Sequence, residues 1–214
     1  MALNKRKVLD AARKFAHKGA KEKALKEYAT LLKADSRDAK LLLEIGGVHR
    51  RWGQNEEAIS YYLRVAEQYK QAGFDARSVA VFKQILNLDN KRYPAYVSLA
   101  ELYQRMGLDA EAVGALQTAA DGYHSDGQKT QSLELLRKMA TLDPSNTTSR
   151  MKVAELLRQE ELLDDAVSEY EAIVEEMVRQ GANDALVTAY KRILEIRPER
   201  GDIEFSLARK LVQL

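Results

Sequence analysis

Hydrophobic residues recur along the chain at intervals of three and four positions, with polar residues between them. In the stretch that begins at residue 58, this spacing is kept by Ala58, Tyr62, Val65 and Tyr69. It matches the 3.6-residue period of an α-helix that buries one face. No stretch shows the two-residue alternation that is typical of a half-buried strand. The pattern therefore predicts an all-α protein.

Glycine, or Asp or Asn near proline, stands where each apolar run stops, and these residues are typical of helix ends and short connections. The breaks divide the chain into about twelve helices, and the connections are short enough to make neighbours antiparallel. The expected helices span residues 4–18, 21–34, 38–52, 55–72, 75–88, 92–106, 109–126, 128–141, 146–159, 162–180, 183–196 and 199–213.

A repeating unit, three helices long, organises these elements. Four segments end alike, with Asp35, Asp89, Asp143 and Arg197 at matching places, and successive residue numbers in this series differ by 54. The repeat predicts units near 1–36, 37–90, 91–144 and 145–198, followed by a partial unit at 199–214. An ungapped shift by one unit also superposes Gly53, Gly107 and Glu161, then Ala58, Ala112 and Ala166, and then Gly19, Gly73, Gly127 and Gly181.

Two helices of each unit resemble the 34-residue tetratricopeptide repeat: a large residue, a small pair, an aromatic, a turn glycine, an alanine and a second aromatic residue. The resemblance covers essentially the whole chain. It implies a single domain, residues 1–214, that is a right-handed α-solenoid similar to bacterial adaptor and scaffold proteins. The matching residues are Leu42, Ile45, Gly46, His49, Gly53, Ala58 and Tyr62, and Val8, Ala11, Ala12, Phe15, Gly19, Ala24, Tyr28 and Asp35.

The composition narrows the chemistry that the chain can perform. The 214 residues contain no cysteine, which excludes disulfides, thiolate metal sites and a cysteine nucleophile. The three histidines stand on different expected helices without metal-ligand spacing, and Gly46 and Gly47 lie inside a helix rather than in a phosphate-binding loop. No run is long and apolar enough to span a membrane. We expect a cytoplasmic protein without catalytic residues, cofactor or metal.

Charge is distributed unevenly along the chain, although the total is only +2. Residues 1–53 hold 14 Lys and Arg against 6 Asp and Glu, while residues 54–214 hold 20 against 26. Residues 155–185 alone hold 2 against 10. Such asymmetry attracts partners of opposite charge over roughly 8 Å at physiological salt.

The tetratricopeptide resemblance implies a concave groove, lined by the first helix of each pair, that takes up a segment of another protein. The groove-facing positions near the amino terminus are basic with some apolar residues, so we expect an acidic or carboxylate-bearing segment as the ligand. The asparagines that clamp a terminal carboxylate in chaperone-binding relatives are replaced by Arg13 and Gly47. The expected partner-binding residues are Arg6, Leu9, Arg13, His17, Lys40, Leu43, Arg50 and Arg51.

Two other functions remain open from the sequence. The basic amino-terminal third would suit nucleic acid, although basic and aromatic residues do not alternate there as in nucleic-acid binders, which makes this partner less favoured. The repeats would also suit a self-associating structural oligomer. The last expected helix, 199–213, carries apolar residues around much of its circumference, so we expect either a homodimer through it or a chain that continues beyond 214.

Overall fold

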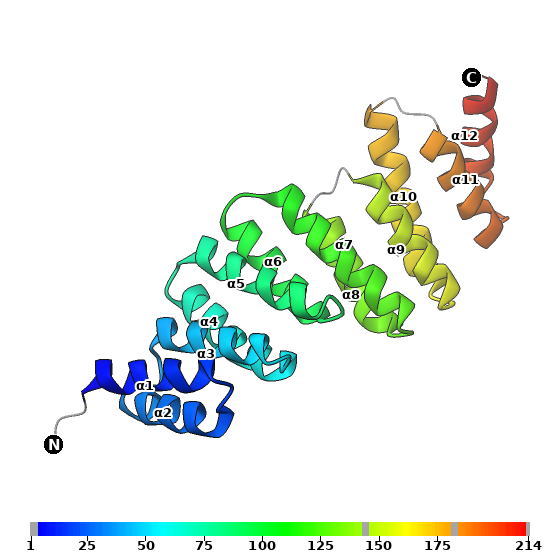
Figure 1. Ribbon diagram of the computed structural model, residues 1–214. Helices are drawn as coiled ribbons and strands as arrows, with labels where there is room; N and C mark the ends of the chain where they lie inside the picture. The colour runs from blue at the N-terminus through cyan, green and yellow to red at the C-terminus, as the bar shows by residue number, and fades with distance from the viewer. Residues whose placement is uncertain (1–3, 143–145, 181–183, 213–214) are drawn as a thin grey trace. The chain divides into compact units, whose positions relative to one another are not determined.

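The computed structural model describes residues 4–142, 146–180 and 184–212, and within these ranges it consists of helices and connections without a strand. The predicted all-α solenoid is confirmed, and each expected helix is present with both ends within two residues of its predicted span (Figure 1). The helices are α1 (Lys5–His17), α2 (Lys21–Ala34), α3 (Ala39–Arg51), α4 (Asn55–Gln71), α5 (Asp75–Leu88), α6 (Tyr93–Arg105), α7 (Asp109–Ser125), α8 (Lys129–Leu142), α9 (Thr147–Gln159), α10 (Leu163–Gln180), α11 (Asp184–Ile196) and α12 (Gly201–Val212).

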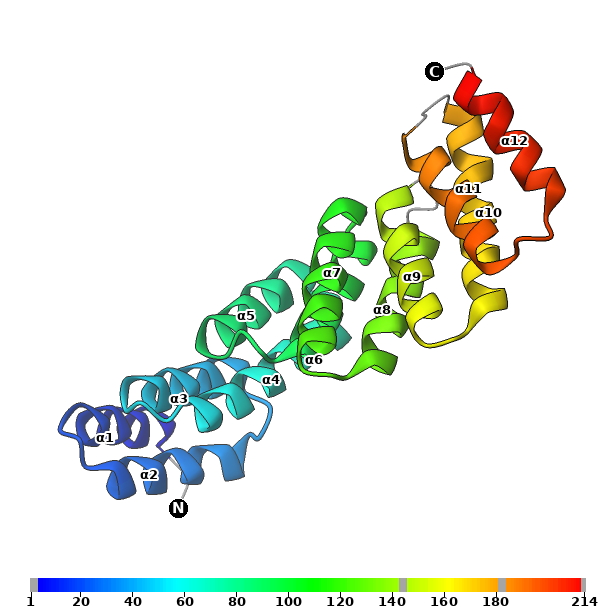
Figure 2. The ribbon, with the colours of Figure 1, turned by 90° about the vertical axis from the view of Figure 1, so that its right-hand side faces the viewer.

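The chain divides into two compact units, one of residues 1–106 with α1–α6 and one of residues 107–214 with α7–α12. Within each unit every helix packs on the next one along the chain. At the amino-terminal end, α1, α2 and α3 lie next to one another (Figures 1 and 2). A single domain over residues 1–214 and a right-handed superhelix remain predictions.

Small residues let neighbouring helices approach closely, while tyrosines and aliphatic side chains fill the space around them. Ala58, Ala112 and Ala166, which occupy the same position in successive repeats, are completely buried. Tyr62 of α4 packs its ring against the backbone of Gly46 in α3, and the ring is itself buried. Such contacts bring two helix backbones closer than two large side chains would allow, as expected for packed interiors.

Glycines with positive φ end several helices, which explains their regular recurrence in the sequence. Gly53 and Gly107 have φ of 73° and 71°, a conformation that costs glycine little because it has no Cβ. The equivalent position of the following repeat is Glu161, which adopts φ of 61°. A side chain in this left-handed conformation is strained, and Glu161 is exposed in the turn between α9 and α10.

Gly46→Ala should destabilise the protein. The added methyl carbon would lie 2.5 Å from Cε1 of Tyr62, and the buried ring has little room to move. We expect the free energy of unfolding to fall by about 1–3 kcal/mol in urea denaturation followed by circular dichroism. Gly114→Ala is the matched control, because no atom lies within 4 Å of its added methyl and alanine favours a helix by about 1 kcal/mol. Equal effects of the two substitutions would contradict this packing.

Glu161→Gly should stabilise the protein, because glycine removes the strain of the left-handed backbone. We expect a gain of about 0.5–1 kcal/mol in the free energy of unfolding, since part of the relief is offset by the greater freedom of glycine in the unfolded chain. Gly107→Ala, at the corresponding turn, should lower it by about 1 kcal/mol. A lower melting temperature for Glu161→Gly would show that the conformation of this turn does not limit stability.

Candidate functional site

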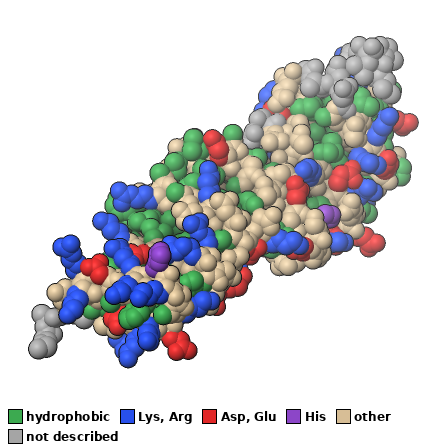
Figure 3. All heavy atoms as spheres, viewed as in Figure 1, with side chains coloured by type: hydrophobic (Ala, Val, Ile, Leu, Met, Phe, Trp, Pro, Cys, Tyr) green, Lys and Arg blue, Asp and Glu red, His purple; other side chains and the backbone are tan. Residues whose placement is uncertain are grey.

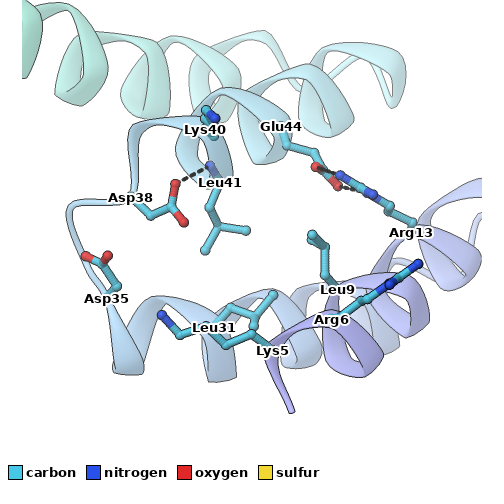
Figure 4. Close-up of a pocket in the computed structure, with 10 residues that line it drawn as sticks. All are labelled: Lys5, Arg6, Leu9, Arg13, Leu31, Asp35, Asp38, Lys40, Leu41 and Glu44. Carbon is cyan, nitrogen blue, oxygen red and sulfur yellow. Dashed lines mark hydrogen bonds and ion pairs between the residues drawn. The ribbon is translucent and has the colours of Figure 1, made fainter. Parts of the chain in front are cut away.

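A pocket of about 310 Å³ lies between α1, α2 and α3 (Figure 4). Its floor is formed by Leu9, Leu31 and Leu41, one from each helix, of which Leu31 and Leu41 are buried and Leu9 is partly exposed. Charged side chains surround this apolar floor. The residues that line the pocket are Lys5, Arg6, Leu9, Arg13, Leu31, Asp35, Asp38, Lys40, Leu41 and Glu44.

The acidic side of the pocket is built from the connection between α2 and α3. Asp38 is the N-cap of α3, and its Oδ1 accepts a hydrogen bond from the backbone N–H of Leu41 at 3.1 Å. Asp35 closes α2, and its Oδ1 accepts from the backbone N–H of Arg37 at 3.0 Å. Both carboxylates are therefore held by local backbone structure. Figure 4 shows them on one side of the pocket, with Arg6 across from them.

Arg13 and Glu44 form another wall, and both belong to a three-residue network. Arg13 of α1 donates to both carboxylate oxygens of Glu44 in α3, from Nε at 2.8 Å and from Nη2 at 2.6 Å. The buried Tyr28 of α2 donates its hydroxyl to Oε1 of Glu44 at 2.9 Å. The network joins all three helices, and its paired geometry is the strong form of an Arg–carboxylate bond.

This network shifts the protonation of its members. The hydrogen bonds from Arg13 lower the pKa of Glu44 below its ordinary value, with the Tyr28 hydroxyl acting in the same direction and partial burial against it. Burial, and then the bond to Glu44, raises the pKa of Tyr28. Glu44 is therefore charged and Tyr28 neutral at physiological pH, which is the state in which every bond of the network is satisfied.

Three cations at the pocket remain available to a ligand. Lys5 and Arg6 stand in the first turn of α1, and Lys40 stands in the first turn of α3. All three are exposed and make no ion pair with any residue that the structure describes. Arg13 differs, because its charge is already matched by Glu44. The pocket thus has an apolar floor, free cations on α1 and carboxylates across from Arg6.

The pocket contains half of the residues predicted to bind a partner. Arg6, Leu9, Arg13 and Lys40 line it. The other four, His17, Leu43, Arg50 and Arg51, lie on α1 and α3 but do not line it. Prediction from the sequence missed Lys5, Leu31, Asp35, Asp38, Leu41 and Glu44. Two of these carried a recognisable signal: Asp35 closes a segment of the repeat, and Asp38 precedes an apolar run, which is typical of an N-cap.

Charge pairing differs sharply between the ends of the chain. Of the fourteen Lys and Arg in residues 1–53, only Arg13 forms an ion pair within the described ranges, and basic side chains crowd the end formed by α1–α3 (Figure 3). In residues 155–185 most acids pair with Arg or Lys, largely from other helices. The paired acids are Glu155, Glu160, Asp164, Asp165, Glu169, Glu171 and Glu176.

Other kinds of site leave no trace in the part of the chain that the structure describes. It contains no group of three or more His, Asp and Glu arranged to hold a metal ion. None of its helices combines the length and apolar character needed to cross a bilayer. The expectations of no metal and no catalytic residue remain predictions.

Glu44→Gln should destabilise the protein at neutral pH, because it removes the charge that holds Arg13. The lowered pKa of Glu44 means that its stabilisation is complete above the ordinary carboxyl pKa of 4.5 and is lost as pH falls through the lower folded value. We expect a difference on the order of 1 kcal/mol in unfolding free energy at pH 7, shrinking as the pH is lowered toward 3. Glu175→Gln, at an exposed position without an ion pair among the described residues, should show little difference at any pH.

The tetratricopeptide-repeat family model matches residues 39–72, which are α3, the turn at Gly53 and α4. No curated protein matches the sequence. Solved structures with similarity include MamA residues 41 to the end from Desulfovibrio magneticus RS-1, with 18% identity, 66% of this chain and 96% of that chain covered, and a TM-score of 0.31. A second is YrrB, a tetratricopeptide protein described as having an unusual peptide-binding site, with 14% identity, 84% of this chain and 96% of that chain covered, and a TM-score of 0.28. A third consists of tetratricopeptide-like repeats of a putative kinesin light chain from Podospora anserina, with 13% identity, 97% of this chain and 92% of that chain covered, and a TM-score of 0.42.

The family match coincides with the helix pair in which Gly46 packs on Tyr62, so the sequence pattern and the packing identify the same repeat. The matched pair is α3 and α4, and α3 also forms one wall of the pocket. Residues 39–72 therefore match one tetratricopeptide repeat, within a chain built of regularly packed helices.

Proposed function

We propose that the chain is a non-enzymatic protein-interaction scaffold that binds an acidic or carboxylate-bearing segment of a partner protein in the pocket between α1, α2 and α3. The observation that carries the proposal is the pairing of an apolar floor with free cations at one site. Stacked helical repeats offer extended surfaces to other proteins, and the family match supports this class of function.

The apolar floor indicates what the partner presents besides its charge. Leu9, Leu31 and Leu41 can bury an apolar side chain, which supplies most of the affinity per unit area. Lys5 and Arg6 then select for a carboxylate beside it, since charges at the rim of an interface contribute mainly to specificity and association rate. Arg13 shapes the wall but is occupied by Glu44. The ligand is thus a segment with an apolar residue next to an acidic one.

Nucleic acid is a second candidate, and one observation favours it. The cations of residues 1–53 other than Arg13 are without ion pairs among the described residues, and unpaired Lys and Arg contact phosphates well. Binding of this kind would not need the leucine floor and would depend on total basic charge rather than on Lys5 and Arg6. Fluorescein-labelled RNA of mixed sequence tests it directly.

Reversal of the free cations should abolish binding of an acidic peptide. The probe is a fluorescein-labelled peptide of alternating Glu-Glu and Leu-Leu pairs, measured by anisotropy in a Phe205→Glu background that is explained below. We expect Lys5→Glu with Arg6→Glu to weaken binding at least about ten-fold without loss of helicity, because acidic residues suit the first turn of a helix. Binding should also weaken as salt rises.

The matched control reverses the same charge on the same helix outside the pocket. Lys7→Glu with Lys14→Glu changes two exposed residues of α1 that do not line the pocket, and binding should change by less than about three-fold. Equal weakening by both double variants would contradict the proposal. Tight binding of the RNA with equal losses in both variants would favour the second candidate.

A further inference from the structure

Helix α12 exposes an apolar side chain between charges of opposite sign. Phe205 is 71% exposed, the most of any large hydrophobic residue among those described. Glu204, Ala208 and Arg209 are also exposed, and with Phe205 they share one face of the helix. Neither Glu204 nor Arg209 forms an ion pair with a residue that the structure describes. Ile203, on the opposite face, is buried.

This face has the chemistry that the pocket of the first unit would accept. The pocket offers an apolar floor, with Lys5 and Arg6 on α1 and with Asp35 and Asp38 across from Arg6 (Figure 4). The helix offers an aromatic ring with an acid at one end and a base at the other, about 7.5 Å apart along its axis at 1.5 Å per residue. Glu204 matches the cations of α1, and Arg209 matches the carboxylates of the α2–α3 connection.

The distribution of charge along the chain also favours contact between its first and last segments. Residues 1–53 carry +8 and residues 54–154 hold 12 Lys and Arg against 12 Asp and Glu. Residues 155–214 hold 8 against 14, a net charge of −6. The two ends of the sequence therefore carry opposite charge on either side of a neutral middle. Opposite net charges on two segments favour the encounter of one with the other.

We propose that the pocket between α1, α2 and α3 binds α12 of a second copy of this chain, with Phe205 on the leucine floor. The inference rests on the same pocket as the proposed function. The contact joins two different surfaces, so it is heterologous, and each copy keeps one free pocket and one free α12. Association then produces chains of copies whose length grows with concentration. An acidic partner segment competes with the second copy for the pocket.

The first measurement is sedimentation velocity of the wild-type chain over a range of concentrations. The weight-average mass should rise above the monomer mass of 24.2 kDa with concentration, and the rise should diminish between ~50 mM and ~500 mM salt. Phe205→Glu should weaken association at least about ten-fold, as should Lys5→Glu with Arg6→Glu. Val178→Glu, at a residue 61% exposed on α10, should leave association unchanged, and Lys7→Glu with Lys14→Glu should change it by less than about three-fold.

Mixing the two defective variants gives the decisive result. Phe205→Glu retains an intact pocket, and Lys5→Glu with Arg6→Glu retains an intact α12, so the mixture has one functional contact. We expect each variant alone to be a monomer and the mixture to form a single species of twice 24.2 kDa. Circular dichroism of each variant confirms that it is folded.

Three outcomes would overturn the inference. A wild-type chain that stays monomeric at every concentration would show that α12 does not bind the pocket of a second copy. Continued association of the Lys5→Glu, Arg6→Glu variant would place α12 against α12 in a symmetric dimer. A mixture that remains monomeric would exclude the contact between unlike surfaces. Peptide binding is measured with Phe205→Glu, where no second copy competes, so failure of the proposed function is recognised separately.

Discussion

The close contact between small and large residues on neighbouring helices determines the rest of the structure. Where Gly46 meets the ring of Tyr62, a single methyl group is excluded, and the alanines at 58, 112 and 166 are completely buried. These contacts set how far apart successive helices lie. The positions of the surface residues follow, because α1, α2 and α3 enclose the pocket only at the separation that their buried residues permit.

Helix positions were predictable from the sequence because each follows from local information. The apolar spacing and the turn glycines mark where a helix begins and ends, and these signals lie within a few residues of each end. The pocket was predictable only in part. Arg13 and Glu44 are 31 residues apart and lie on different helices, and nothing in the local pattern indicates that their side chains meet. Arg13 therefore looked like a free ligand of the groove, although it is an internal partner of Glu44.

The acidic stretch at 155–185 also forms contacts that the local sequence does not indicate. Counted along the sequence it is strongly negative, but helices stack side by side, so each acid meets the residues of its neighbours rather than those next to it in the chain. Arg150 of α9 reaches Glu169, Arg192 of α11 reaches Glu155, and Arg200 reaches Glu171 from the connection between α11 and α12. A related trio recurs here: the Tyr170 hydroxyl donates to Glu155, which also pairs with Arg192. In both trios the tyrosine is on the middle helix of three. The arginine is on the preceding helix and the glutamate on the following helix in the Arg13, Tyr28 and Glu44 network, whereas this order is reversed in the second trio.

The locked state of Arg13 has a consequence for the thermodynamics of binding. Immobilising a long side chain at an interface costs about 0.5–1.5 kcal/mol in lost rotamer freedom. Arg13 is already held by Glu44 in the free protein, so this wall is preorganised and its entropic cost belongs to folding. Lys5 and Arg6 are still free to rotate, and their ordering falls on the binding step. Differences in affinity between ligands should therefore arise at the α1 end of the pocket, whereas the Arg13 wall acts as a rigid template that every ligand meets in the same shape.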